Sequence, residues 1–121
     1  STHPLTIQIA NNQKMRVATR LTNGTTTAVS SALTSDVLAL GIWTHVAVVH
    51  DGDAGVRKIY FNGVLKSQTV IAGTQDWSNS TRKLTLGRVS LTASDGFMGA
   101  IDDFQLYDRA LTDSEVQQIA Q

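Results

Sequence analysis

The segment from Gly41 to Leu65, GIWTHVAVVHDGDAGVRKIYFNGVL, constrains the fold most, because strand-like runs and turns follow one another within it. Residues Trp43 to His50 are mostly apolar, aromatic or β-branched, and the turn-forming residues Asp51 to Gly55 end this run. The return strand runs from Val56 to Phe61. Asn62-Gly63 then readily adopts the positive φ angles of a tight hairpin turn. The segment therefore predicts two consecutive β-hairpins.

Further strands are predicted on both sides of these hairpins, where apolar and polar residues alternate between turn-forming residues. The clearest is Leu5 to Ala10, in which Leu5, Ile7 and Ile9 alternate with polar or small residues. Ser31 to Leu40 has poor periodicity, which fits either a short strand or a loop. The other predicted strands are Met15–Leu21, Thr25–Ser30, Leu65–Ile71, Leu84–Val89 and Phe97–Tyr107.

The chain ends in a predicted helix. Thr112 can accept a hydrogen bond at its start, and Glu115, three residues later, can bond the Thr112 backbone N–H in return. Val116, Ile119 and Ala120 supply an apolar stripe. Strands and helices do not alternate along the chain, so the crossovers of a parallel sheet are missing. The sequence therefore predicts an all-β fold, an antiparallel two-sheet sandwich with a short C-terminal helix.

Composition excludes several classes of protein. The 121 residues suffice for one domain and are too few for two. Hydrophobic residues make up 41% and charged residues 17%, a balance common in extracellular β-sheet modules. Ten basic residues balance ten acidic ones, so we expect no nucleic acid partner. Apolar runs are only strand-sized, which predicts no membrane insertion, and the absence of cysteine excludes disulfides.

Two ordered patterns, one in the central hairpins and one in the C-terminal third, match a known family. The first comprises Gly41, Trp43, His45, Val46, Ala47, Asn62 and Gly63. The second comprises Leu84, Leu86, Gly87, Phe97, Gly99, Ile101, Asp102, Asp103, Phe104, Leu106, Tyr107, Arg109, Ala110, Leu111 and Thr112. Together these residues resemble the laminin-G-like modules of the concanavalin A-like lectin and glucanase domains. The resemblance implies a jelly-roll arrangement of the sandwich.

The resemblance also implies strands that precede Leu5, the first of which pairs beside the segment from Ile101 to Tyr107. We therefore expect residues 1–121 to be a single laminin-G-like domain that is a partial or shortened module of a larger protein. An uncovered apolar sheet edge invites association. We expect the chain to self-associate through a sheet edge, or to complete its sandwich with another segment.

The acidic residues do not indicate catalysis. Glycoside hydrolysis requires two carboxyl groups that flank one bond. In jelly-roll glucanases the resemblance implies an E-x-D-x-E arrangement on one strand, and this sequence lacks it. Glu115 is the only glutamate, and helix capping explains it. We therefore expect no enzymatic activity and assign no catalytic residue.

Asp102 is the candidate metal ligand. In the predicted strand it shares a face with Phe104 and Leu106, so its partly desolvated carboxylate needs backbone donors or a cation. In related jelly rolls the aspartate at this place resembles a Ca²⁺ ligand that acts with backbone carbonyls, which suits the oxygen preference of calcium. The alternative is a structural aspartate that accepts bonds from backbone N–H groups. Calcium is the one cofactor that the resemblance implies.

The longest predicted loop contains Trp77 together with Asp76, Asn79 and Arg82. Ligand sites combine aromatic surfaces with a few placed polar groups. The indole could stack on a pyranose while the other side chains bond its hydroxyl groups, so these residues form the candidate ligand-binding site. The alternative is a tryptophan that folds back over a sheet edge. Trp43, by contrast, begins an apolar central strand and is predicted to lie in the core.

Three classes of function remain. The favoured class is a non-catalytic adhesion module, extracellular or on the cell surface, that binds a glycan or an extracellular protein. The second is a structural spacer or assembly domain of a multidomain surface protein. The third, a divergent glycoside hydrolase, is disfavoured by the arrangement of carboxylates.

Overall fold

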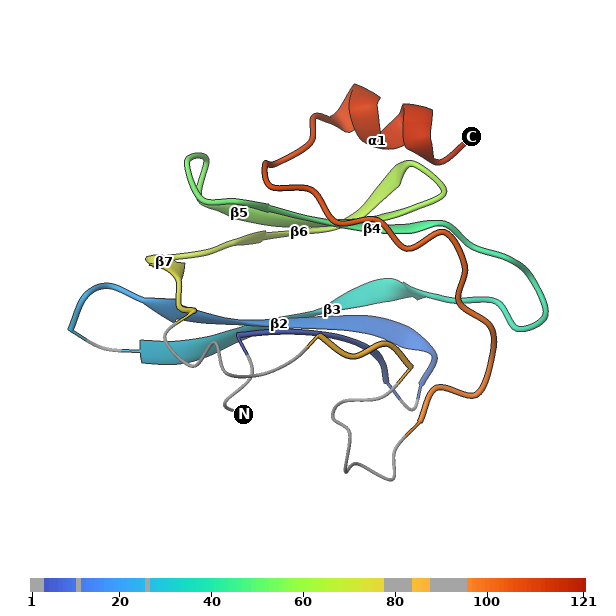
Figure 1. Ribbon diagram of the computed structural model, residues 1–121, viewed down its shortest axis with the longest axis horizontal. Helices are drawn as coiled ribbons and strands as arrows, with labels where there is room; N and C mark the ends of the chain where they lie inside the picture. The colour runs from blue at the N-terminus through green and yellow to red at the C-terminus, as the bar shows by residue number, and fades with distance from the viewer. Residues whose placement is uncertain (1–3, 11, 26, 78–83, 88–95) are drawn as a thin grey trace.

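The structure is a computed structural model that describes residues 4–10, 12–25, 27–77, 84–87 and 96–121. Its strands form two antiparallel sheets, β1-β2-β3 with the short β7 paired to β2, and β4-β5-β6. Figure 1 shows the two sheets stacked face to face, with α1 on the outer side of the second sheet. The predicted two-sheet sandwich with a C-terminal helix is confirmed. The elements are β1 (Leu5–Ile9), β2 (Lys14–Thr22), β3 (Thr27–Val37), β4 (Val46–Asp51), β5 (Val56–Phe61), β6 (Val64–Val70), β7 (Thr74–Gln75) and α1 (Asp113–Ile119).

Both predicted hairpins of the central segment form. β5 lies between β4 and β6 and pairs antiparallel with each. Asn62 and Gly63 make the second turn with φ angles of 51° and 79°. Asn62 also bonds back to the start of β4: its N–H donates to the His45 carbonyl oxygen (2.8 Å), and its Oδ1 accepts from the His45 N–H (2.9 Å). The Asn-Gly turn therefore fixes the entry to β4 as well as the hairpin.

The main core lies between the two sheets. β2 and β5 are the central strands of their sheets, so each can bury one whole face against the other. Burial of apolar surface contributes about 25 cal/mol per Å². The core side chains are Met15, Val17, Ile59 and Phe61, and the partly buried Leu38, Val46 and Val48 pack against them.

α1 covers the outer face of the second sheet. Val116 is buried there against Val49 and Tyr60. The Tyr60 hydroxyl donates to Asp113 Oδ1, and Lys58 Nζ lies 3.3 Å from the same oxygen. The second sheet is therefore covered on both faces, by the first sheet on one side and by α1 on the other.

The start of α1 confirms the predicted capping box. The Glu115 N–H donates to Thr112 Oγ1 (3.2 Å), and the Thr112 N–H donates to Glu115 Oε1 (3.0 Å). Arg109 adds a further bond from Nη1 to Glu115 Oε1 (2.9 Å). These local contacts end the preceding coil and set the first residue of the helix at Asp113.

β3 settles the alternative left open for residues 31–40. The strand runs through to Val37 along β2, so most of this segment is strand. Its alternation is weak because β3 is an edge strand, and Asp36 on it pairs with Lys66 of β6 at 2.7 Å. Residues 84–87 of the predicted strand Leu84–Val89 are not in a strand, and residues 88 and 89 lie outside the described residues.

The prediction of a strand from Phe97 to Tyr107 is wrong. Residues 97–107 form no strand, and all of them are exposed. In Figure 1 this orange segment runs along the side of the sandwich towards α1. Asp103 has a φ of 52°, outside the extended region, so the alternation of faces expected for Asp102 and Phe104 does not apply. An alternating pattern forms a strand only where a partner edge satisfies its backbone groups.

The prediction that Trp43 lies in the core is also wrong, because its side chain is 69% exposed. β4 begins at Val46, so Trp43 belongs to the loop before the strand. The large aromatic side chains buried on this sheet are Phe61 and Tyr60 of β5. A tryptophan next to an apolar run is buried only if the strand extends far enough to include it.

Candidate functional site

The loop that carries Trp77 is fastened to the C-terminal end of β2. β7 pairs with this end of β2, and the Asp76 N–H donates to the Arg20 carbonyl oxygen (2.7 Å). The Asp76 side chain is only 9% exposed, and its Oδ2 lies 3.0 Å from Arg20 Nε. Removal of one partner from a buried ion pair is strongly destabilising. Backbone and side chain together therefore hold the residue that precedes Trp77.

Gly73 permits the close approach of this loop to β2. Its φ is +87°, and a Cβ at this position would lie 2.5 Å from the Thr22 carbonyl oxygen. Only glycine meets both conditions. Sequence reasoning singled out neither Gly73 nor Arg20. The role of Gly73 could have been predicted from the sequence, because this glycine opens a polar loop. The pairing of Arg20 with Asp76 could not, because the two residues lie far apart in the chain and only the tertiary structure brings them together.

Trp77 extends from this anchored corner into solvent, with 55% of its surface exposed. About half of the residue is thus accessible to a ligand. Of the four predicted ligand-binding residues, the structure places Asp76 and Trp77 together, while Asn79 and Arg82 lie outside the described residues. The contacts of Asp76 give it an anchoring role, and direct contact of its carboxylate with a ligand stays a prediction.

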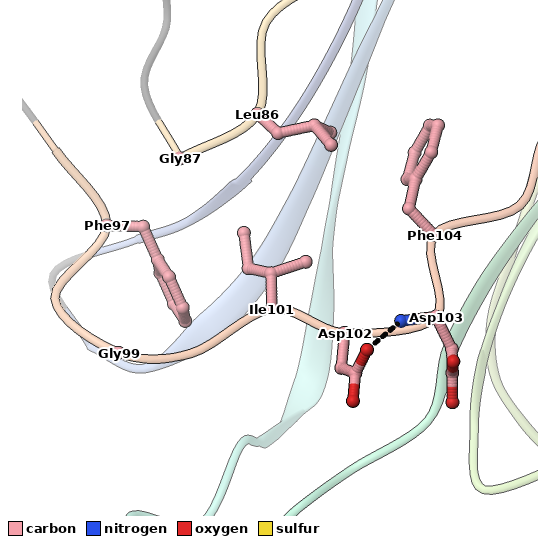
Figure 2. A pocket seen from close by; sticks show the side chains of 8 residues that line it. All are labelled: Leu86, Gly87, Phe97, Gly99, Ile101, Asp102, Asp103 and Phe104. Carbon is pink, nitrogen blue, oxygen red and sulfur yellow. Dashed lines mark hydrogen bonds between the residues drawn. The ribbon is translucent and has the colours of Figure 1, made fainter.

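A second feature is the open hollow around Asp102, about 350 Å³ in volume. Figure 2 shows the side chains of Leu86, Ile101 and Phe104 on one side of the backbone, and the carboxylates of Asp102 and Asp103 on the other. The full lining consists of Leu86, Gly87, Phe97, Gly99, Ile101, Asp102, Asp103 and Phe104. The hollow is therefore lined by apolar side chains and by polar groups, which include the two carboxylates.

The surroundings of Asp102 offer little to calcium. Its Oδ1 accepts the Asp103 N–H (2.8 Å), which is the backbone contact expected of a structural aspartate. Calcium takes six to eight oxygen ligands. Within the described part of the chain, no three His, Cys, Asp or Glu side chains gather into a metal site. Calcium at Asp102 stays a prediction, to be tested by calorimetric titration of the chain and of Asp102→Ala.

Among the described residues, the pKa values of three ion-paired carboxyl groups are lowered, those of Asp36, Asp113 and Glu115. Hydrogen bonds from Lys66 and Tyr60 lower the pKa of Asp36 and Asp113, respectively. A hydrogen bond from Arg109 is the main cause that lowers the pKa of Glu115 to about 2. A general acid requires the opposite, a carboxyl group whose pKa is raised. These three groups therefore serve as ion-pair partners.

A family comparison agrees with this architecture. Residues 1–117 match the laminin-G-type family model of the concanavalin A-like lectin/glucanases superfamily, so the chain belongs to this superfamily. The resemblance inferred from the central hairpins and the C-terminal motif is confirmed. A search of curated proteins finds no match. No helix in the described ranges is long and apolar enough to cross a membrane.

A solved structure has a similar fold. It is the crystal structure of residues 221–444 of an S-layer domain-containing protein from Clostridium thermocellum ATCC 27405, with a TM-score of 0.62 and 24% sequence identity. The match covers 89% of this chain and 52% of that one. The present chain thus spans about half the length of the structure that it matches.

Proposed function

We propose that this domain is a non-catalytic binding module, extracellular or on the cell surface, that recognises a glycan or an extracellular protein in adhesion. The observation that carries the proposal is the half-exposed indole of Trp77 on a corner anchored by Asp76 and Arg20. An aromatic side chain on a fixed support binds with little loss of conformational freedom. A pyranose ring is a suitable ligand, because one of its faces is apolar and its edge carries hydroxyl groups.

The superfamily and the fold support the general part of this proposal. The superfamily includes lectins as well as glucanases, and the similar fold occurs in an S-layer domain-containing protein. Function must still be argued from the site, because one fold hosts many functions.

The test is a glycan array probed with the full chain, with Trp77→Ala and with Trp43→Ala. The two tryptophans lie at opposite ends of the sandwich. Trp43 precedes β4, whose first residue pairs with Phe61, and Phe61 packs with Met15 near the start of β2, whereas Trp77 follows β7, which pairs with the end of β2. Trp43→Ala therefore controls for the general loss of an exposed indole. We expect Trp77→Ala to weaken binding about tenfold or more, and Trp43→Ala to leave it unchanged.

Thermal unfolding of both variants provides the folding control, because neither side chain is buried. Binding that survives in Trp77→Ala, or that is lost equally in both variants, would contradict a site at this corner. If the chain binds no glycan on the array, an extracellular protein remains as the proposed ligand. A pull-down with extracellular proteins and the same pair of variants would test this.

A second candidate function is that of an assembly domain in a multidomain surface protein. The observation that favours it is the open edge of the first sheet, where Leu5, Ile7 and Ile9 of β1 are exposed although they face the inner side of the sandwich. Concentration-dependent association of the chain would support this function, and a strictly monomeric chain would count against it.

A further inference from the structure

β1 is an outer strand of the first sheet, and two flanking hydrogen bonds show which of its backbone groups face β2. The Arg20 N–H donates to the Pro4 carbonyl oxygen (3.0 Å), and the Ala10 N–H donates to the Lys14 carbonyl oxygen (2.8 Å). The register between these bonds is unbroken. In an antiparallel pair, residues bonded to the partner strand alternate with residues that are not. The even-numbered residues of β1 therefore bond to β2.

The odd-numbered residues Leu5, Ile7 and Ile9 consequently direct their N–H and C=O groups away from β2, towards the outer edge. No described residue outside β2 pairs with β1. An edge of this kind is a template for pairing with another strand.

The same three residues carry the apolar side chains of the strand. Ile7 lies opposite Val17, which is fully buried in the core, so Ile7 faces the inner side of the sheet. It is nevertheless 48% exposed, and Leu5 and Ile9 are exposed to 37% and 39%. The outward backbone groups and the uncovered apolar side chains therefore belong to the same three residues of β1.

The other outer strands carry the charges that normally prevent such pairing. β3 contains Asp36, β4 contains Asp51 and β6 contains Lys66, whereas β1, LTIQI, contains no charged residue. Asp36 and Lys66 also pair with each other and close the β3–β6 side of the sandwich. Of the outer strands β1, β3, β4 and β6, β1 is therefore the one without a charge against association.

We propose that two copies of this chain associate through β1, antiparallel and centred on Ile7, so that their first sheets join into one continuous sheet. In this register Ile7 lies opposite Ile7 of the partner subunit, and Leu5 lies opposite Ile9 of the partner subunit. Every outward backbone group of the three residues then has a partner. The arrangement is self-complementary, as a two-fold interface requires. It also brings the uncovered apolar side chains of both copies together on one face.

The first test measures association of the full chain by sedimentation velocity over a range of concentrations. The variant is Ile7→Lys, which places two ammonium groups opposite each other across the two-fold axis. The matched control is Val70→Lys, because Val70 is an exposed apolar residue at the end of outer strand β6 in the other sheet. We expect a monomer–dimer equilibrium that Ile7→Lys weakens about tenfold or more and that Val70→Lys leaves unchanged.

The second test examines the register and does not depend on the charge variant. The chain has no cysteine, so a single introduced thiol can only pair with a second copy. Opposed residues that exchange hydrogen bonds have Cα atoms about 5.5 Å apart, within disulfide reach. Ile7→Cys should therefore form a disulfide-linked dimer under mild oxidation. Leu5→Cys should not, since the two copies of this residue would be offset by four positions, about 14 Å.

Three outcomes would overturn the proposal. The first is a chain that stays monomeric at all concentrations, in which case any strand that β1 accepts comes from a different protein. The second is a dimer that persists in Ile7→Lys but dissociates in Phe104→Lys, which would place the interface on the exposed 97–107 segment. The third is cross-linking of Leu5→Cys as fast as that of Ile7→Cys, which would contradict the register.

Discussion

The central hairpin strand β5 and the C-terminal segment 97–107 both carry the residue pattern of a strand, and both contain motifs of the superfamily. β5 pairs with β4 on one side and β6 on the other, and four of its six residues are buried. No described strand pairs with the C-terminal segment, and its residues are exposed. The comparison shows that a pattern specifies which face of a strand is apolar, while neighbouring strands decide whether the strand forms.

Energetics explain the difference. The backbone groups of β5 are bonded within the sheet, and its two faces pack against the first sheet and against α1. The C-terminal segment could gain little by extending alone, because fixing the backbone costs about 1–2 kcal/mol per residue. The following predictions test this contrast, from the largest expected effect to the smallest.

Truncation of one isoleucine in each region gives the sharpest contrast. Ile59 of β5 is 1% exposed, whereas Ile101 is 52% exposed. We expect Ile59→Ala to lower the free energy of unfolding by about 3 kcal/mol, because it leaves a cavity in the core. Ile101→Ala should change it by less than about 0.5 kcal/mol. Urea denaturation measures both. Equal losses would show that residues 97–107 are packed in solution.

A pair of glycines provides a second contrast. Gly63 has a φ of +79°, and a Cβ there would lie 3.1 Å from the Gln117 backbone of α1. Gly63→Ala should therefore cost about 2 kcal/mol in unfolding free energy through backbone strain and displacement of the helix. A Cβ on Gly99 would meet only the ring of Phe97, at 2.8 Å, and this exposed ring can rotate away.

Gly99→Ala should consequently stay within about 0.5 kcal/mol of the parent chain. Thermal unfolding compares the two glycine variants under one set of conditions. A large loss from Gly99→Ala would mean that the backbone at this position is tightly confined, contrary to the exposed segment seen in the structure.

Loss of the helix cap tests whether α1 protects the outer face of the hairpin. Thr112→Ala removes the acceptor for the Glu115 N–H and should cost about 1 kcal/mol. The exposed Gln118→Ala is the control and should be near neutral. Hydrogen exchange should accelerate at Val49 of β4, which lies beneath Val116. Unchanged exchange at Val49 would show that the hairpin is stable without α1.

Acidification should loosen the packing of α1 against the second sheet, and this is the smallest of the expected effects. The pKa of Glu115 in the folded chain is lowered to about 2, chiefly by its hydrogen bond from Arg109, from a reference value of 4.5. A lowered folded pKa means that the contribution to stability is present above pH 4.5 and is lost as the pH falls towards 2. The pKa of Asp113 is also lowered, chiefly by Tyr60, so its contribution has the same sign.

NMR signals of Val116 should therefore shift on acidification before those of the core residue Val17. Glu115→Gln is the control, because its side chain does not titrate and this part of the transition should disappear. Simultaneous loss of both signals in the parent chain would contradict separate loosening of α1.

The sequence predicted Trp77 as a candidate ligand-binding side chain, which the structure leaves 55% exposed, but it did not predict the contacts that support this residue. The indole was identifiable because it stands alone among polar loop residues. That support is the pairing of Arg20 with Asp76, which are more than fifty positions apart in the chain. Trp43 shows the converse error, since a strand that begins at Val46 leaves it in solvent.

The sequence by itself determined the features that depend on a few neighbouring residues. These are the Asn62-Gly63 turn, the Thr112–Glu115 capping box and the alternation that gives β1 and β2 their inner faces, because each follows from local backbone preference or side-chain period. Only the tertiary structure decided the features that need a distant partner. These are the ion pair below Trp77, the exposed course of residues 97–107 and the open edge of β1, because hydrogen bonding and burial there depend on which strand lies alongside.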